Sequence, residues 1–241
     1  MIVIPMAGRS QRFRDAGYEA AKFMLPLGVS NVFAHAVSSF ERYFEDTPFL
    51  FITMGDEAAD FVTGESARLG IAQARVAALA ASTAGQAETV ALGLDKAGAG
   101  DDVALTIFNI DTFRPGFQAP GAELAALDGW LEVFQGEGAN WSYVKPSPGE
   151  PGLVLETAEK RQISDLCCTG LYHFARAGDF RQALAAERQR PQARELYIAP
   201  LYNHLIGWGA RIGYRTISRQ DVVFCGTPDE YEVLRRPAEP Y

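Results

Sequence analysis

The segment from residue 9 to residue 22 concentrates positive charge. Its charged residues are Arg9, Arg12, Arg14 and Lys22 on one side and Asp15 and Glu19 on the other. The whole chain, by contrast, has a formal net charge of −8. Fixed guanidinium and ammonium groups are well suited to holding phosphate oxygens. An exposed loop is the competing interpretation, because arginines usually lie at protein surfaces, and no complete glycine-rich phosphate motif decides between the two.

A turn of small residues precedes these cations. Ala7, Gly8 and Ser10 follow the apolar run of residues 2–6, which predicts a strand. Ligands bind at the carboxyl ends of strands in open α/β sheets, and small residues there let backbone N–H groups approach an anion. The sequence therefore favours an anion site close to the start of the chain.

Asp111 offers a carboxylate at a second strand end. It closes an apolar run over residues 103–110, so its side chain should emerge at the carboxyl edge of the sheet. An Asp-Thr turn or a helix cap would also place an aspartate here. Because Mg²⁺ is commonly held by one or two carboxylates together with substrate phosphates, we favour a metal role for Asp111.

Gly85 and Gln86 precede a helical pattern and have two interpretations. Residues 83–86 form a capping-box pattern, in which Gln86 would bond to its own helix. Gly85, however, would let a ligand approach the backbone closely. Glu159 and Lys160 also have two interpretations, because an exposed ion pair on a turn would give the same sequence pattern as a ligand-binding pair. Trp141 lies in a predicted strand, where an aromatic residue is more typical of the core than of a stacking site.

Strands and helices must alternate in the first half to position these residues. Strand-like runs at residues 2–6, 49–53, 75–79 and 103–108 alternate with helical stripes at residues 32–44, 57–69 and 87–94. Continuous apolar strands between helices predict a mostly parallel sheet covered on both faces. The predicted fold class is α/β.

The second half is richer in short strands. Strand-like runs occur at residues 130–134, 141–144, 153–156 and 171–174, and helical patterns at residues 180–190 and 198–205. Thr227, Pro228 and Glu230 predict a capped helix near the end. We expect a single domain over residues 1–241, with a strand-rich lobe in its second half.

The charge balance excludes several classes of protein. An acidic chain with 22 Lys and Arg against 30 Asp and Glu lacks the basic face that nucleic acids need, and it has no polybasic membrane anchor. No apolar stretch reaches the length of a membrane helix, and no signal-peptide pattern follows Met1. The three cysteines form no disulfide framework, and Cys167 and Cys168 are expected to be small buried apolar residues. We expect a cytoplasmic protein, with homo-oligomerisation possible in principle.

Six segments in chain order resemble the sugar-phosphate nucleotidyltransferase family. They are Ala7-Gly8-x-Ser10-x-Arg12-Phe13 followed by Lys22 and Leu25-Pro26-Leu27, Gly85-Gln86-Ala87-Glu88-Thr89, Asn109-Ile110-Asp111-Thr112, Glu159-Lys160, Thr169-Gly170-Leu171-Tyr172, and Gly226-Thr227-Pro228-Asp229. The resemblance spans most of the chain. It implies an enzyme that transfers a nucleotidyl group from a nucleoside triphosphate to a phosphorylated sugar or small alcohol and releases pyrophosphate. It also implies a Rossmann-like sheet similar to the glycosyltransferase-A arrangement, with a nucleotide-binding half to about residue 112 and an acceptor-binding half after it.

The resemblance implies a role for each matching residue. As catalytic groups, Arg12 would hold the β- and γ-phosphates, and Lys22 the α-phosphate and the acceptor phosphate. Nucleotide binding is implied for Ala7, Gly8, Ser10, Gly85 and Gln86, acceptor binding for Lys145, Glu159, Lys160, Thr169 and Gly170, and Mg²⁺ binding for Asp111. Lys145 is included because only four lysines occur in the chain and it lies near the expected acceptor segment.

One position departs from the family pattern. Members often have a second metal-binding Asp two residues before the late Gly-Thr, and Phe224 stands there in this chain. Either Asp111 binds the metal mainly with substrate oxygens, or another acid such as Asp221 contributes. We expect CTP as the nucleotide, with UTP or dTTP next, and a product used for capsule or other surface polysaccharides. A metal-dependent glycosyltransferase and a non-catalytic nucleotide-binding regulator are the alternatives.

Overall fold

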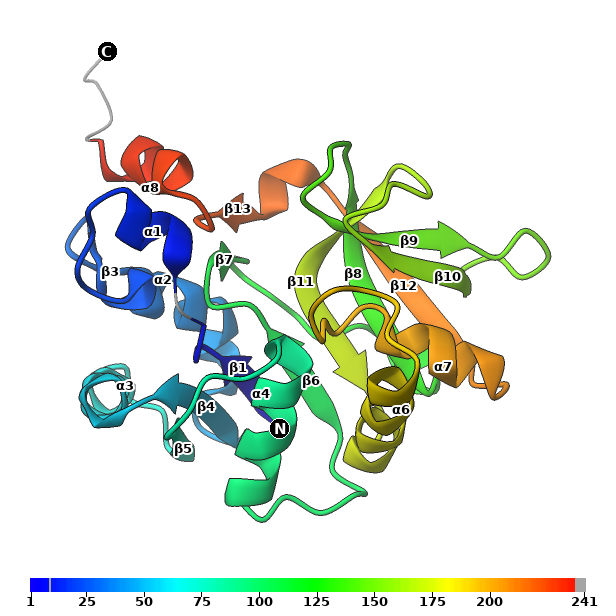
Figure 1. Cartoon of the computed structure of the whole chain (residues 1–241), viewed down its shortest axis with the longest axis horizontal. Coiled ribbons are helices and arrows are strands. Elements are labelled where there is room, and N and C mark those ends of the chain that lie inside the picture. The colour runs from blue at the N-terminus through cyan, green and yellow to red at the C-terminus, as the bar shows by residue number, and fades with distance from the viewer. Residues whose placement is uncertain (9, 237–241) are drawn as a thin grey trace.

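The strands of the first half pair in parallel. β1 (Ile2–Pro5) lies between β4 (Phe49–Met54) and β6 (Leu105–Phe108), and β5 (Ala74–Leu79) pairs with β4. Within residues 1–8 and 10–236, the part of the chain that this computed structural model describes, these strands belong to a nine-stranded sheet (Figure 1). The parallel α/β sheet predicted from the sequence is confirmed for this half.

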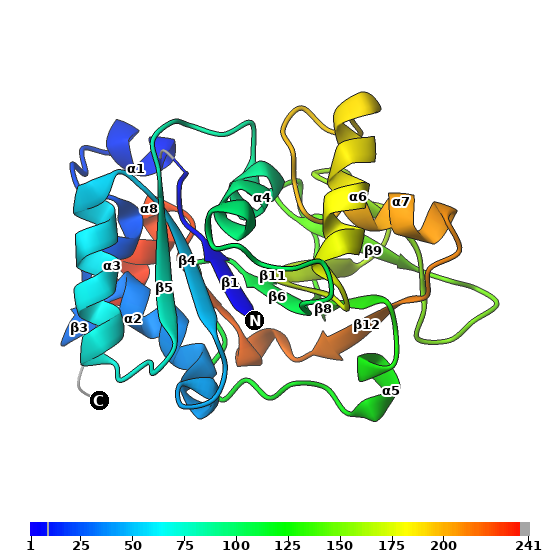
Figure 2. The same cartoon turned by 90° about the horizontal axis from the view of Figure 1, so that it is seen from below.

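Helices cover both faces of these strands. They are α2 (Val32–Val37), α3 (Asp56–Arg68) and α4 (Gln86–Lys96). Val3 and Leu50 pack in the same core cluster as α4, whereas Ile4 and Phe51 pack in the cluster that includes α2 and α3. Successive side chains of a strand point to opposite faces, and Figure 2 shows α4 on the other side of these strands from α2 and α3.

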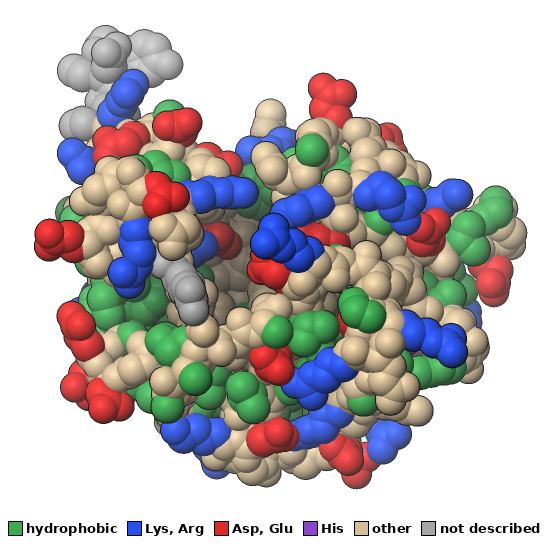
Figure 3. Space-filling view, viewed as in Figure 1, with side chains coloured by type: hydrophobic (Ala, Val, Ile, Leu, Met, Phe, Trp, Pro, Cys, Tyr) green, Lys and Arg blue, Asp and Glu red, His purple; other side chains and the backbone are tan. Residues whose placement is uncertain are grey.

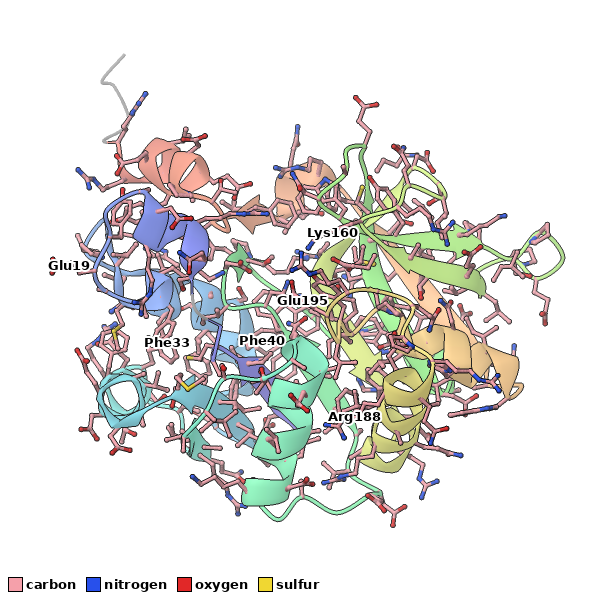
Figure 4. The ribbon with its side chains drawn as sticks, in the orientation of Figure 1. Glu19, Phe33, Phe40, Lys160, Arg188 and Glu195 are labelled. Carbon is pink, nitrogen blue, oxygen red and sulfur yellow. The ribbon has the colours of Figure 1, made fainter. Side chains whose placement is uncertain are left out.

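The helical stripe over residues 32–44 is interrupted. α2 ends at Val37 and continues as the 3₁₀ helix η2 (Ser38–Tyr43), with non-helical angles at Phe40. The ring of Phe40 is fully buried, and its centroid lies 4.9 Å from that of Phe108. Phe33 and Phe40 both lie in the left part of the molecule in Figure 4. The apolar spacing therefore predicted the buried positions correctly but not the break in the helix.

A long antiparallel strand joins the second half to the first. β11 (Leu166–Phe174) pairs with β6 along one edge and with β8 (Gly129–Gln135) along the other. The lobe continues through β9 (Ser142–Pro146) and β10 (Val154–Glu159), and β12 (Ile212–Ile217) pairs in parallel with β8. The sequence analysis did not predict β12, whose central Gly and Arg interrupt its apolar pattern.

Three helices complete the second half. α6 (Ala177–Gln189) and α7 (Leu201–Gly207) pack on each other and on the strand-rich lobe, and α8 (Pro228–Arg235) closes the described chain. The predicted capping box at the start of α8 is confirmed, because Thr227 and Glu230 bond to each other's backbone N–H groups. The hydroxyl of Tyr231 donates to the carbonyl of Pro26 at 2.7 Å, so α8 returns to the first half of the chain.

Short elements fill the connections. They are α1 (Gln11–Asp15), η1 (Lys22–Met24), β2 (Pro26–Leu27), β3 (Ser30–Asn31), β7 (Thr112–Phe113), α5 (Ala122–Ala125), η3 (Arg219–Asp221) and β13 (Val223–Phe224). α1 lies inside residues 9–22, for which an exposed loop was the competing interpretation, and η1 begins at the end of that segment. In the described residues, no helix combines the length and apolar character needed to cross a membrane.

Candidate active site

Two adjoining cavities lie at the carboxyl edge of the parallel strands. The first, here called the α4 cavity, has a volume of about 570 Å³ and is lined by residues around the start of α4 and the end of β1. The second, here called the β11 cavity, has a volume of about 380 Å³ and is lined by β11 and the strands beside it. Both share four lining residues: Gln86, Asn109, Asp111 and Tyr197. Figure 3 shows the surface hollowed near its centre, with Lys and Arg side chains beside the hollow.

The α4 cavity gathers most of the residues expected to bind nucleotide. Ala7, Gly8 and Ser10 line it from the segment after β1, and Gly85 and Gln86 line it from the start of α4. Ser10 has left-handed backbone angles, with φ of 49°, directly before α1. The predicted anion site thus has its small-residue turn at the carboxyl end of β1, as expected for an open α/β sheet.

Lys22 and Asp111 meet where the two cavities join. The Nζ atom of Lys22 lies 2.5 Å from Oδ2 of Asp111, and both side chains are about three-quarters buried. Lys22 lines the α4 cavity, and Asp111 lines both cavities. Lys22 begins η1, and Asp111 follows β6, so two elements 89 residues apart in sequence place an ion pair at the border.

Gly85 is required for a reason other than the predicted one. A Cβ atom at Gly85 would lie 2.5 Å from the backbone nitrogen of Leu196. The backbone of Leu196 donates to the carbonyl of Ala84 at 3.0 Å and accepts from the N–H of Ala87 at 2.8 Å. The close approach that Gly85 allows is therefore made by another segment of the same chain, although Gly85 still lines the cavity.

Gln86 does not cap its own helix, so the capping-box interpretation of residues 83–86 was wrong. Its Nε2 donates to Oδ1 of Asn109 at 2.6 Å. The helix start is instead fixed by Glu88, whose Oε2 accepts from the N–H of Ala84 at 2.7 Å and whose Oε1 pairs with Arg188 of α6. The side chain of Gln86 therefore faces both cavities.

Glu159 lies in the β11 cavity with a polar partner. The hydroxyl of Ser142 donates to Oε2 of Glu159. Burial raises the pKa of the Glu159 carboxyl above its ordinary value, while the hydrogen bond from Ser142 and the charge of Lys160 act in the opposite direction. A half-buried carboxylate beside a hydroxyl can accept hydrogen bonds from ligand hydroxyl groups.

Thr169 and Gly170 form part of the wall of this cavity. The side chain of Thr169 is buried, and its hydroxyl is directed to Glu132 rather than into the cavity, at 3.4 Å from Oε1. This differs from the expected role of a hydroxyl offered to the ligand. Gly170 has φ of 95°, and a Cβ there would lie 2.5 Å from Nδ2 of Asn109. The bare backbone at Gly170 thus makes room for Asn109, which lines both cavities.

Behind this wall lies a buried ion pair that the sequence analysis missed. Nε of Arg114 donates to Oε1 of Glu132 at 2.9 Å, and Glu132 is fully buried. Oε2 of Glu132 has no hydrogen-bond partner among the described residues, although Arg215 lies 3.9 Å away. No local pattern marks these residues, because they come from a loop and two strands far apart in the sequence. Removing one partner of such a pair strands a buried charge.

The two lysines expected to bind the acceptor lie in different places. Nζ of Lys160 donates to the hydroxyl of Tyr197 at 2.6 Å, and Tyr197 lines both cavities, although Lys160 itself lines neither. Lys145 is exposed on β9, opposite Glu156 of β10, and does not line either cavity. The structure therefore places Lys160 next to a residue that lines both cavities. It does not support an acceptor-binding role for Lys145.

Aromatic side chains form one wall of the β11 cavity. The ring of Trp141 lies 4.6 Å from that of Phe224 and 5.2 Å from that of Phe134, measured between centroids. Trp141 and Phe224 both line the cavity. Trp141 thus has core-like packing on one side, as predicted, and also borders a space that a ligand can enter.

The second carboxylate of the family pattern is not replaced by Asp221. Asp221 caps η3, where its side chain accepts from the N–H of Ser218, and it does not line either cavity. In the described part of the chain, no group of three or more His, Cys, Asp or Glu residues is arranged to hold a metal. Across from Asp111 lies Gly226, where a Cβ would be only 3.1 Å from Oδ2. Any metal at Asp111 would need substrate oxygens as further ligands.

The arginines near the start of the chain are distributed differently from the expectation. Arg12 is exposed and lines the β11 cavity, whereas its neighbour Gln11 lines the α4 cavity. Arg9 lies outside the described residues. Cys167, Cys168 and Cys225 are all buried, as expected for the first two, and burial raises the pKa of the Cys225 thiol to about 12.

Solved structures resemble this chain over most of its length. A nucleoside-diphosphate-sugar pyrophosphorylase from Vibrio cholerae RC9 is 50% identical, with a TM-score of 0.93, and the match covers 98% of this chain and 100% of that one. An inositol-1-phosphate CTP transferase from T. maritima is 10% identical, with a TM-score of 0.73 over 97% of this chain and 94% of that one. An apo UDP-glucose pyrophosphorylase is 15% identical, with a TM-score of 0.74 over 97% and 96%.

The last two similarities show the fold alone, whereas the first also relates the sequences. No protein-family model matches the chain, and no curated protein matches it. The similarity to the Vibrio cholerae protein extends over both cavities, from β1 to α8. With half of its residues identical to that protein, the chain belongs to the sugar-phosphate nucleotidyltransferase family.

Proposed function

We propose that this chain transfers a nucleotidyl group from a nucleoside triphosphate to a phosphorylated sugar or small alcohol and releases pyrophosphate. The observation that supports this most directly is the contact between Lys22 and Asp111 at the border of two cavities. A bisubstrate reaction of this kind needs two anions brought together at one point. The α4 cavity would take the nucleotide and the β11 cavity the acceptor.

The reaction needs positioning and charge neutralisation more than covalent chemistry by the protein. An oxygen of the acceptor phosphate forms a bond to the α-phosphorus of the triphosphate. The bond from that phosphorus to the bridging oxygen breaks, and its electron pair leaves with pyrophosphate. Lys22, at the border, would neutralise charge on the α-phosphate and on the incoming phosphate, and such fixed cations are a main source of rate enhancement.

Arg12 is proposed to hold the departing pyrophosphate. It follows Ser10 and Gln11, which line the α4 cavity, and its own side chain reaches the neighbouring cavity. Because Arg12 lines the β11 cavity and not the α4 cavity, the phosphates of a triphosphate bound in the α4 cavity would have to extend past the border to reach it. Its fork geometry suits a phosphate held in one place.

We propose Asp111 as the ligand of a Mg²⁺ ion. Its carboxylate and the room beside Gly226 fit such an ion when phosphate oxygens complete the coordination. When bound, the ion would supply charge neutralisation for the triphosphate. Phe224 removes the second carboxylate of the family pattern, so Asp111 would serve as the main protein ligand.

CTP is proposed as the nucleotide, ahead of UTP and dTTP. The amide nitrogen of Gln86 is bonded to Asn109, while its amide oxygen has no hydrogen-bond partner among the described residues. An amide oxygen accepts hydrogen bonds, which suits the exocyclic amine of cytosine better than the carbonyl of uracil. The acceptor would be placed by Glu159 and by the aromatic wall of the β11 cavity. We also propose that the product serves capsule or other surface polysaccharide synthesis, which rests on family resemblance.

Pyrophosphate release tests this proposal. The whole chain is incubated with Mg²⁺, each common nucleoside triphosphate and a panel of phosphorylated sugars and alcohols. We expect pyrophosphate only when both substrates are present, with the highest rate for CTP. A glycosyltransferase would instead release a nucleoside diphosphate from a nucleotide sugar, and a regulator would bind triphosphate without turnover. Either result would refute the proposed reaction.

A further inference from the structure

Tyr197 occupies a position that the family resemblance does not assign. It lines both the α4 cavity and the β11 cavity, and its hydroxyl accepts a hydrogen bond of 2.6 Å from Nζ of Lys160. The ammonium of Lys160 also lies 4.7 Å from the centre of the Tyr197 ring. Figure 4 shows Lys160 and Glu195 near each other in the central part of the molecule.

The segment that carries Tyr197 is fixed on both sides. On one side, the backbone of Leu196 makes two hydrogen bonds to the start of α4, as described above for Gly85. On the other side, the carbonyl of Ala199 accepts from the hydroxyl of Thr157 of β10 at 2.6 Å. Ile198, between them, is buried. Tyr197 is therefore held between anchors on the nucleotide side and on the acceptor side.

Lys160 needs such a partner more than most lysines. Its side chain is exposed, and an unpaired lysine loses rotamer freedom when it is fixed in one position. Its backbone has left-handed angles, with φ of 53°, and its N–H donates to the carbonyl of Trp141 at 2.9 Å. The backbone is thus set, and the hydroxyl of Tyr197 fixes the far end of the side chain.

We propose that Tyr197, which lines both cavities, is a positioning residue that holds the ammonium of Lys160 beside their junction, ready for the acceptor phosphate. This inference rests on the proposed function, because it takes the phosphate of the acceptor as the ligand of Lys160. The hydrogen bond to Tyr197 also raises the pKa of Lys160, which keeps the ammonium charged. A pre-positioned cation lowers the entropy lost when the phosphate binds.

A double-mutant cycle on the whole chain tests this role. The variants are Tyr197→Phe, Lys160→Met and the double variant, and inorganic phosphate is the probe, titrated by ³¹P NMR without any turnover. We expect Tyr197→Phe to weaken phosphate binding about fivefold, a typical effect of removing one hydrogen bond to a charged group. In the Lys160→Met background, the same change should have less than about a twofold effect, because coupled residues are not additive.

Tyr214→Phe is the matched control. It removes the same oxygen atom from a tyrosine of β12 that lines neither cavity, and we expect unchanged phosphate affinity. Equal weakening by Tyr197→Phe with and without Lys160 would overturn the inference, and a general folding defect would give that same additive result. Unchanged phosphate affinity in Tyr197→Phe would overturn it as well.

Steady-state kinetics supply the second measurement. Tyr197→Phe should raise the KM for the phosphorylated acceptor about fivefold while kcat and the KM for the triphosphate stay close to those of the wild type, because a group that binds ground state and transition state equally affects KM alone. A rise in the KM for the triphosphate instead would contradict the assignment. If the wild-type chain releases no pyrophosphate with any acceptor, the proposed function fails, while the phosphate titration still decides the role of Tyr197.

Discussion

The α4 cavity and the β11 cavity are built in different ways. The α4 cavity lies at the carboxyl end of β1 and the start of α4, and it is lined by small residues such as Ala7 and Gly8 together with larger ones such as Lys22 and Phe23. The β11 cavity lies along antiparallel strands, and its wall combines small residues such as Gly170 with larger side chains such as Trp141, Glu159 and Phe224. The proposed nucleotide side therefore lies at the ends of parallel strands and at a helix start, whereas the proposed acceptor side lies along antiparallel strands and has an aromatic wall. We therefore expect substitutions in the aromatic wall to affect the proposed acceptor more than the proposed nucleotide.

We expect the largest effect from a substitution at the border of the two cavities, because both proposed substrates would contact the same cation there. Lys22→Met removes the cation that contacts Asp111. We expect kcat/KM to fall by about a thousandfold or more, in the range of other fixed transition-state cations. Lys96→Met is the matched control, because Lys96 is the exposed last residue of α4, lines neither cavity and donates to the carbonyl of Ala78. A loss below tenfold at Lys22 would show that the reaction centre lies elsewhere.

A glycine substitution tests whether the α4 cavity depends on backbone packing. Gly85→Ala brings a Cβ to 2.5 Å from the backbone of Leu196, which cannot rotate away. We expect a loss of about 2–3 kcal/mol in the free energy of unfolding, measured by urea denaturation, since strained backbone substitutions belong to the strongly destabilising class. Gly8→Ala has nothing within 4 Å of its new Cβ and should change stability little. Equal stability of the two variants would show that the close packing between Gly85 and Leu196 does not contribute to stability.

The fold was predictable where its signals are local. Continuous apolar runs and helical stripes indicated the parallel strands and α4, and Thr227 and Glu230 indicated the cap of α8. The unpredicted strand β12 depends on its pairing with β8, which no local pattern in residues 212–217 reveals. The helix break at Phe40 likewise follows from packing against rings that come later in the chain.

The candidate site divides in the same way. Ala7, Gly8, Ser10, Gln86 and Asp111 all line the α4 cavity and were found from short segments at strand and helix ends. The sequence did not indicate the contact between Tyr197 and Lys160, or the buried pair of Arg114 and Glu132, because their members are separated by long stretches of chain. Gly85 was predicted to let a ligand approach the backbone, and the structure shows that Leu196 makes that close approach instead.

A substitution in the β11 cavity should weaken acceptor binding and leave triphosphate binding unchanged. Glu159→Gln removes the negative charge beside Ser142 in the β11 cavity. We expect the KM for the acceptor to rise about tenfold, a typical result for one hydrogen bond to a charged group, while the KM for the triphosphate stays unchanged. Glu156→Gln, on the same strand but paired with Arg161 outside both cavities, is the control. Parallel rises in both KM values would contradict separate sites.

The smallest expected effect concerns metal binding without substrates. In the substrate-free chain, Lys22 already contacts the carboxylate proposed to bind Mg²⁺, so a metal must compete with it. Titration with Mn²⁺, followed by electron paramagnetic resonance, should show affinity about fivefold tighter in Lys22→Met than in the wild type, because removing a neighbouring positive charge favours a second cation. Asp111→Asn should bind no better than the wild type. Equal affinities in all three proteins would place the metal away from Asp111.

The joining of two substrates at the Lys22–Asp111 border is tested most directly by following the phosphorus atoms of the reaction. ³¹P NMR of the whole chain with Mg²⁺, CTP and the best acceptor from the screen reports every product at once. The phosphomonoester signal of the acceptor should decline in step with the appearance of a diphosphate-linked product and an equal amount of pyrophosphate, and Lys22→Met should abolish all three changes. A phosphomonoester that stays intact while nucleoside diphosphate accumulates would contradict nucleotidyl transfer at this site.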